Sequence, residues 1–193
     1  MVCEKCDLTE AEIYNLNFDN ISITKSYLTK AIVSNSKFNN AILNNNNYAY
    51  ASFYKFESKN SDLTNSSFAL SRCNESHFEN SLFDNSLFAN AKLNKCYFYA
   101  ASFIKTSFVN ANLSDSVFTR ANFNEAIFKD SDLSSANFSY ADFTNATIDK
   151  INLEHATLYG SNITDEQLKH VISLRCAVMP DGNVFDNNGQ DDC

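Results

Sequence analysis

Large apolar residues recur every five positions along most of this chain. The stretch ANFNEAIFKDSDLSSANFSYADFTNA, residues 121–146, has Phe or Leu at every fifth position and Ala or Ser two residues before each one. The register runs without insertion or deletion from Leu8 to Ile163. A helix repeats every 3.6 residues and a strand every 2.0, so the pattern fits neither element alone. The unbroken register predicts one continuous solenoid whose units pack on their neighbours.

A second period of 20 residues lies within the first. Leucine recurs among the Phe positions at Leu93, Leu113, Leu133 and Leu153. Four units therefore form one coil, and residues 20 apart should stack. We expect Phe103 to contact Phe83 and Phe123 more closely than Phe98 or Phe108 contacts either of them. Hydrogen-bonded strands lie about 4.8 Å apart, so about eight coils would make a rod roughly 40 Å long.

The small residue of each unit should also point inward, because a narrow coil has room for one large side chain per side. The three other positions hold mainly Asn, Asp, Ser, Thr and Lys and should face solvent. The chain has only 3 Gly and 1 Pro, so its corners need another device. Asn and Ser form side-chain to backbone hydrogen bonds that hold tight turns, and we expect such bonds here.

The repeat is broken at YKFESKNS, where Phe56 takes the small position and Ser58 the large one. Ser58 lies between Phe38 and Phe78 in its column. A missing ring costs a few kcal/mol, and an unpaired buried hydroxyl costs about 1–3 kcal/mol. We therefore expect Phe56 to point inward and fill the volume that Ser58 vacates, while Ser58 bonds to nearby backbone.

The units ANFNE, SDLSS and ADFTN resemble the A(D/N)LXX consensus of the pentapeptide repeat family over residues 3–164. The resemblance implies an all-β solenoid, a right-handed quadrilateral parallel β-helix of about eight 20-residue coils. Most proteins of that family have no assigned function. A minority resemble double-stranded DNA in shape and charge, bind DNA gyrase and give quinolone resistance.

Three segments follow from the pattern. Residues 1–164 form the β-helix, residues 165–182 a C-terminal helical cap and turn, and residues 183–193 an acidic, disordered tail. Thr164 to Gln167 fits a capping box, and Leu168, Val171 and Ile172 would share the apolar face of a short helix laid on the last coil. The first coil has no evident cap, so a second copy of the chain is one expected partner. The chain shows neither a signal peptide nor a run of 18 apolar residues, and we expect a cytoplasmic protein without membrane contact.

The six cysteines do not form a recognisable framework. Cys3, Cys6, Cys73 and Cys96 occupy inward positions and are expected to be buried small apolar residues. Cys3 and Cys6 have C-x-x-C spacing, but neither a second pair nor a histidine cluster accompanies them, so we expect no metal site. Cys176 and Cys193 lie beyond the repeats, and the sequence leaves open whether they pair.

Catalysis and DNA mimicry are both poorly supported. The three histidines are scattered and no glycine-rich phosphate loop occurs, so we expect neither an enzyme nor a cofactor. A DNA mimic needs dense negative charge. The net charge is −8, but residues 165–193 carry −4 of it, and the coils have 17 acids against 13 bases. Direct nucleic-acid binding is not expected, and a gyrase-binding mimic is the alternative to a binding scaffold.

Two faces are candidate interaction surfaces for a protein partner or a second copy. Outward residues around the column Tyr48, Phe68, Phe88 and Phe108 carry no charge. We call this surface the uncharged strip, with Tyr50, Leu70, Leu87, Val109 and Ile127 as its candidate contact residues. A second surface, the tyrosine group, consists of Tyr97, Tyr99, Tyr140 and Tyr159. The face around Cys73 and Leu93, in contrast, is rich in charge, including Arg72 and Lys92.

Overall fold

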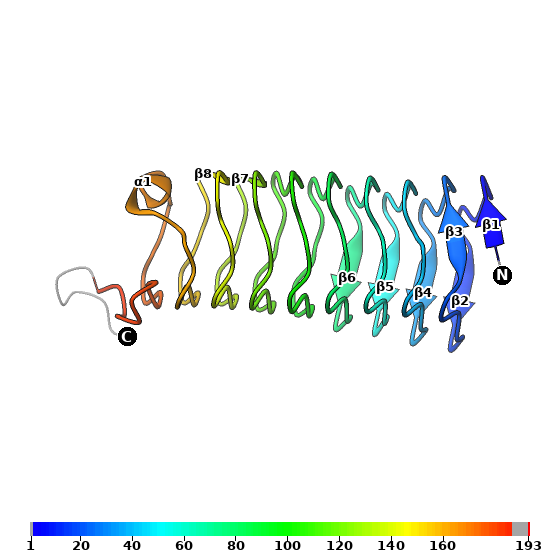
Figure 1. The fold of residues 1–193 in the computed structure, drawn as a ribbon, viewed down its shortest axis with the longest axis horizontal. Helices are drawn as coiled ribbons and strands as arrows, with labels where there is room; N and C mark the ends of the chain where they lie inside the picture. Colours follow the sequence, from blue (N-terminus) through cyan, green and yellow to red (C-terminus); the bar gives the residue numbers. More distant parts are fainter. Residues whose placement is uncertain (1, 187–192) are drawn as a thin grey trace.

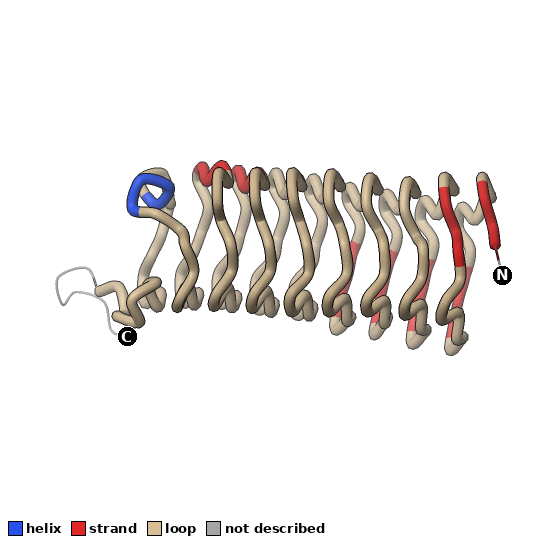
Figure 2. Tube along the Cα trace, viewed as in Figure 1, coloured by secondary structure: helices blue, strands red, loops and turns tan. Residues whose placement is uncertain are grey.

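The computed structural model describes residues 2–186 and 193. The chain winds into a long rod, with the N-terminal coil at one end and the C-terminal segment at the other (Figure 1). The regular strands are three residues each, and most of the remaining path is turn (Figure 2). They are β1 (Val2–Glu4), β2 (Glu12–Tyr14), β3 (Ser22–Thr24), β4 (Ile32–Ser34), β5 (Ser52–Tyr54), β6 (Arg72–Asn74), β7 (Ile127–Lys129) and β8 (Thr147–Asp149).

The strands pair parallel along the rod with a register of 20 residues. The sheet orders are β1-β3, β2-β4-β5-β6 and β7-β8, and single parallel bridges continue the ladders between these strands. One column of such pairs runs through Val2, Ser22, Ile42, Asp62, Leu82, Ser102, Asn122 and Asp142. The spacing becomes 21 where Asn152 pairs with Ser173. The predicted parallel β-solenoid with 20-residue coils is confirmed; its right-handed sense stays a prediction.

Each corner is turned by a residue in the left-handed backbone region. Every fifth residue from Lys5 to His155 has a φ of about +50° to +60°, and Gly160 continues the series. Asparagine is common at this position because it tolerates the left-handed region better than other side chains do. The sequence analysis did not identify this role.

A second device closes the same turns, as predicted. The side chain before the large residue accepts a hydrogen bond from the backbone N–H two residues later, as Asn112 does from Ser114 (2.9 Å) and Asn137 from Ser139 (2.9 Å). Such turns need Asp or Asn, whose short side chains reach this N–H. The pattern explains the D/N at the second position of the repeat.

The core is a lattice of aromatic rings stacked along the rod. Phe103 lies 5.0 Å from Phe83 and 5.2 Å from Phe123 between ring centroids, with near-parallel rings. Phe98 lies 5.8 Å from Phe83, and Phe108 lies 6.0 Å from Phe123. The stacking prediction is therefore confirmed. Rings of adjacent sides meet edge to face, an arrangement that aromatic quadrupoles favour.

Most buried serines at the small position form hydrogen bonds along the axis, although the Ser71 and Ser161 hydroxyls have no partner among the described residues. The Ser61 hydroxyl donates to the Phe38 carbonyl (2.8 Å) and accepts from the Ala41 N–H (3.1 Å). Asn46 occupies the same kind of position and donates to the Tyr48 hydroxyl (2.8 Å). Buried polar groups are tolerated where they have such partners.

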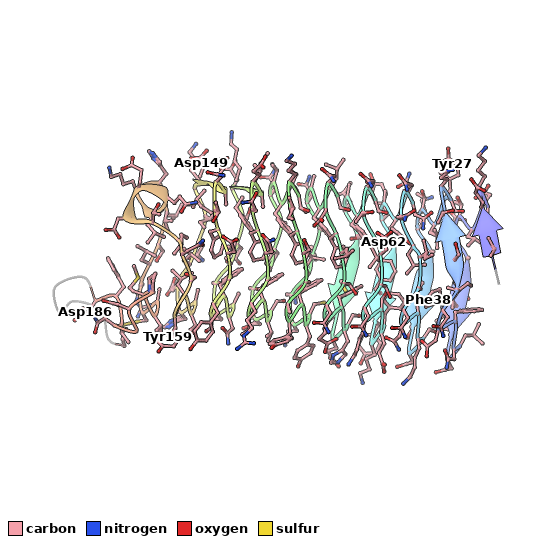
Figure 3. All side chains as sticks on the ribbon, viewed as in Figure 1. Tyr27, Phe38, Asp62, Asp149, Tyr159 and Asp186 are labelled. Atoms are coloured by element: carbon pink, nitrogen blue, oxygen red, sulfur yellow. A yellow bond between two sulfur atoms is a disulfide. The ribbon has the colours of Figure 1, made fainter. Side chains whose placement is uncertain are left out.

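The prediction that the Phe56 ring points inward is confirmed. The prediction that the Ser58 hydroxyl bonds to nearby backbone is wrong. Phe56 is buried, with its centroid 5.2 Å from Phe38 and 5.7 Å from Phe78. Figure 3 shows Phe38, one of its neighbours, among the side chains along the rod. The Ser58 hydroxyl is buried and forms no hydrogen bond with any described residue. With the Phe56 ring in the coil, this hydroxyl has no acceptor in reach.

The cap is shorter than the sequence suggested. Helix α1 spans Asp165–Leu168 and begins with the predicted capping box, in which Thr164 and Gln167 bond each other's backbone N–H. Gln167 Nε2 also donates to the carbonyls of Phe143 (2.8 Å) and Ala146 (2.9 Å). Leu168 is buried, but Ile172 is 71% exposed because the helix ends before it. The expected shared apolar face does not extend to Ile172.

The segment after the cap returns to it. Val184 pairs antiparallel with Val178, and the Phe185 N–H donates to the Ala177 carbonyl (2.7 Å). Residues 183–186 of the expected disordered tail are therefore ordered. Residues 187–192, on which the rest of that expectation falls, lie outside the described part of the chain.

The cysteines divide into two disulfides and two buried thiols. Cys3 bonds to Cys6 in the first coil, and Cys176 bonds to Cys193. Cys3 and Cys6 lie at the open end of the first coil and are only half-buried, so the expectation that they are buried small apolar residues is wrong for these two. Cys73 and Cys96 are buried and free, as expected. Burial and the neighbouring Cys96 raise the pKa of the Cys73 thiol.

Candidate interaction surface

The uncharged strip lies along one face of the rod. Parallel bridges join its outward residues into a single line: Asn47, Ser67, Leu87, Ser107 and Ile127. Tyr50 is 58% exposed and Leu87 52%, Leu70 and Ile127 are exposed too, and Val109 is half-buried. All five candidate contact residues thus have side chains at the surface.

Tyr27 extends the strip by one coil, which the sequence analysis did not recognise. It is exposed and pairs with Asn47. The 20-residue register places Tyr27 directly in line with Leu87, and its charged neighbour Lys30 marks the edge of the uncharged strip.

A groove follows the corner between the uncharged strip and the charged face. It has a volume of about 460 Å³ and spans four coils. Its lining includes Lys30, Ile32, Tyr50, Leu70, Arg72 and Lys92. The sequence analysis placed Tyr50 and Leu70 on one face and Arg72 and Lys92 on another; the structure brings these side chains to the same groove.

One row of the groove consists of left-handed corner residues, and two of them, Tyr50 and Leu70, have large side chains without charge. Tyr50 and Leu70 have φ values of 60° and 59°, in the left-handed corner position. The next two coils have Asn90 and Asn110 there, with the same backbone. A bulky side chain is disfavoured in this region, so Tyr50 and Leu70 are not the residues that the fold itself prefers.

The tyrosine group does not form one cluster. Tyr97 stacks on His77, with centroids 4.5 Å apart. Tyr99 accepts a weak hydrogen bond of 3.4 Å from Arg120 Nη1.

Tyr140 meets Tyr159 edge to face at 5.5 Å. The negative charge of an ionised Tyr159 raises the pKa of the Tyr140 hydroxyl. The positive charge of Arg120 lowers this pKa by less, so the net shift is upward. The Tyr140 ring covers Gly160, where an added Cβ would lie 2.6 Å from two ring carbons. A larger residue at this corner would require the Tyr140 ring to move. Figure 3 places Tyr159 and Tyr27 at opposite edges of the rod, so the two candidate surfaces face different directions.

The sequence profile described as pentapeptide repeats matches residues 6–45, 81–120, 96–134 and 136–172, in eight copies. These ranges cover more than half of the chain and follow the register of its coils. The chain belongs to the pentapeptide repeat family. The longest stretch outside these ranges, residues 46–80, contains the Phe56–Ser58 exchange, yet its pairing keeps the 20-residue register of the other coils.

A solved structure of another protein shares this architecture. The plasmid-mediated fluoroquinolone resistance protein QnrB1 aligns over 97% of this chain and 92% of its own, with a TM-score of 0.75 and 16% identity. HetL, involved in heterocyst differentiation regulation in the cyanobacterium Nostoc, aligns over 94% of this chain and 92% of its own, with a TM-score of 0.36 and 19% identity. No curated protein matches the sequence. At these identities the likeness to QnrB1 concerns the fold alone.

Ion pairs between coils neutralise much of the charge on this pentapeptide repeat protein. Several lysines face a glutamate one coil away, as in Lys30–Glu10 (2.9 Å) and Lys37–Glu57 (3.3 Å). Burial raises the pKa of Glu79, but the hydrogen bond from His77 and the charge of Lys59 outweigh it, and the net shift is downward. The acids of the rod are thus interleaved with bases.

Two structural features are absent from the part of the chain that the structure describes, residues 2–186 and 193. No three His, Cys, Asp or Glu side chains in this part of the chain gather where they would hold a metal ion. No helix within it has the length and apolarity needed to span a bilayer.

Proposed function

We propose that this pentapeptide repeat protein is a non-enzymatic binding scaffold. It presents the uncharged strip, on a rigid rod, to a protein partner or to a second copy of itself. The observation that carries the proposal is the exposure of Tyr50, Leu70, Leu87 and Ile127 along one face. Contiguous apolar surface with a polar surround is typical of protein interfaces.

The strained corners add to this argument. Left-handed residues occur at every corner of the rod, so the conformation alone does not mark a site, but a bulky side chain is disfavoured in it. An asparagine in place of Tyr50 or Leu70 would adopt the left-handed corner conformation with less strain, as Asn90 and Asn110 do. Large apolar side chains at these exposed positions therefore support a role in binding rather than in folding.

A pair of charge substitutions tests the scaffold proposal. Leu87→Glu with Val109→Glu places two carboxylates on the strip, and both side chains reach the surface, so the solenoid should still fold. We expect the variant to lose self-association in sedimentation velocity or to lose the proteins that the wild type captures. Ile42→Glu with Leu82→Glu is the matched control, because both residues are exposed on a different face. Equal behaviour of the two variants would rule out the strip as the interface.

A DNA mimic that binds a type II topoisomerase is the alternative, and the charge distribution disfavours it. Such a mimic needs a row of unpaired carboxylates, whereas Glu10, Glu57 and Glu75 each face a lysine one coil away. We expect no inhibition of DNA gyrase by the purified protein in a supercoiling assay. Inhibition at micromolar protein concentration would favour the alternative.

A further inference from the structure

We propose that the groove beside the uncharged strip binds an extended acidic peptide segment of a partner protein. This inference rests on the proposed scaffold function and names the chemistry of its ligand. The groove has two cationic side chains, Arg72 and Lys92, in one row and two large side chains, Tyr50 and Leu70, in the other.

Two of the three cationic side chains of the groove, Arg72 and Lys92, have no counter-charge among the described residues, whereas Lys30 pairs with Glu10. Arg72 and Lys92 pair directly on adjacent coils, and neither forms an ion pair with a described residue. Like charges opposite each other on paired strands are destabilising. Elsewhere on the rod a lysine commonly faces a glutamate one coil away, as Lys105 faces Glu125 (3.7 Å). A carboxylate from a ligand between Arg72 and Lys92 would remove their repulsion and gain two charge-assisted hydrogen bonds.

The other side of the groove favours a peptide as the source of that carboxylate. Tyr50 and Leu70 are exposed and line the same space. An extended peptide points successive side chains in opposite directions. Acidic side chains alternating with apolar ones would therefore meet the two sides of the groove at the same time.

The dimensions limit the ligand to a short segment. Lys30 and Lys92 stand three coil steps apart, about 14 Å at the usual strand spacing. An extended chain rises about 3.3 Å per residue, so about five residues fill this length.

Acids stand in the same two rows beyond each end of the groove. Glu10 and Glu12 precede it, and Asp130 and Asp132 follow it. A nucleic-acid strand running past four coils would meet these carboxylates, and the protein as a whole carries a net charge of −8. Both facts favour a short acidic peptide over a nucleic acid.

Fluorescence anisotropy with a defined probe tests the inference. The probe is a fluorescein-labelled peptide with the core sequence EVEVE between glycines, and the comparison peptide has QVQVQ. We expect the full-length protein to bind the acidic peptide at least tenfold more tightly than the glutamine peptide, with affinity falling as salt is raised. An eight-nucleotide oligothymidylate should bind more weakly than the acidic peptide.

Matched variants assign the binding to the groove. Arg72→Gln with Lys92→Gln should weaken acidic-peptide binding at least tenfold, while Lys129→Gln with Lys150→Gln, which removes the same charge elsewhere, should change it less than twofold. Circular dichroism checks that both variants fold. Equal losses in the two variants, failure of the wild type to bind, or preference for the oligonucleotide would each overturn the inference. The variant that combines Leu87→Glu with Val109→Glu should still bind the peptide. The peptide-binding proposal for the groove and the scaffold proposal for the uncharged strip can therefore fail independently.

Discussion

At the residue scale, the corner position decides which side chains the fold tolerates. Every coil needs left-handed residues at its corners, and the chain supplies them mostly without glycine. An L-residue with a Cβ loses about 1–2 kcal/mol in this conformation, and asparagine loses less because of its local hydrogen bonds. Leu70 is thus a place where the sequence departs from what the backbone favours.

Leu70→Asn should stabilise the protein by about 1 kcal/mol, because it relieves left-handed strain and removes only an exposed side chain. The midpoint of urea unfolding, at unchanged slope, measures the gain. Asn90→Leu, at the same corner one coil later, is the reciprocal change and should destabilise by a similar amount. A loss of stability in Leu70→Asn would mean that the Leu70 side chain packs more favourably than its exposure suggests.

Ser58→Ala should stabilise the protein by about 1 kcal/mol. The Ser58 hydroxyl is buried without a hydrogen bond to any described residue, and its removal ends the desolvation cost. Ser61→Ala is the matched control, because the Ser61 hydroxyl bonds Phe38 and Ala41 and its loss should destabilise by about 1 kcal/mol. Chemical denaturation of both variants checks the contrast, and equal effects would contradict the assignment.

Phe56→Ala should cost about 3–5 kcal/mol, as much as Phe103→Ala, because both rings fill the coil interior. Restoring the repeat with Ser58→Phe alone should overpack the coil and lower the melting temperature. A clearly raised melting temperature for Ser58→Phe would show that unfilled space remains beside Phe56.

At the element scale, the coil is the unit of structure and each coil depends on its neighbours. Where the repeats stop, backbone carbonyls of the last coils have no further coil to bond. Gln167 of α1 donates hydrogen bonds to two of these carbonyls, those of Phe143 and Ala146. A one-turn helix contributes little stability of its own. Its value to the fold lies in these hydrogen bonds and in the buried Leu168.

Gln167→Glu separates the two roles of this residue. A glutamate keeps the acceptor of the capping box, but it cannot donate to the Phe143 and Ala146 carbonyls. We expect faster amide hydrogen exchange in the coils next to the cap and unchanged exchange near Phe103, with a loss of about 1–2 kcal/mol in global stability. Uniform exchange changes along the rod would argue that the cap stabilises all coils equally.

The disulfides yield a prediction about the compartment. Disulfides persist in oxidising environments and are rare in the cytosol. Protein prepared from its native host without reductant, then unfolded and alkylated, should show two reactive thiols, from Cys73 and Cys96. Six reactive thiols would agree instead with the cytoplasmic location that the sequence suggested.

At the scale of the whole molecule, the fold could be predicted because the 20-residue period of the sequence gives the number of residues in one coil. The Leu column and the unbroken register determined which residues stack, and Phe103 follows that prediction. Features that depend on a single coil were harder to foresee. The bonding of Ser58, the short α1 and the pairing of Cys3 with Cys6 depend on local distances or on chain ends, which a periodic pattern does not encode.

The candidate surface was predicted only in part for a related reason. Counting by 20 identified the row that contains Leu87 and Ile127. The groove forms across a corner, between Leu70 on one row and Arg72 on another, and an analysis of one face at a time separates these residues. Strain at Tyr50 and Leu70 was also hidden, because the sequence analysis did not assign the fifth residue to the left-handed region.

The direction of the backbone pairing has a mechanical consequence. Bonds between coils, such as the one from the Leu28 N–H to the Asn47 carbonyl (2.8 Å), join segments about one coil apart in sequence. A load applied between the ends of the rod therefore breaks the hydrogen bonds of one coil at a time rather than those of all coils together. Each coil that yields releases 20 residues, about 65 Å of slack. Stretched between its ends, the protein should lengthen in even steps at low force and behave as an extensible tether.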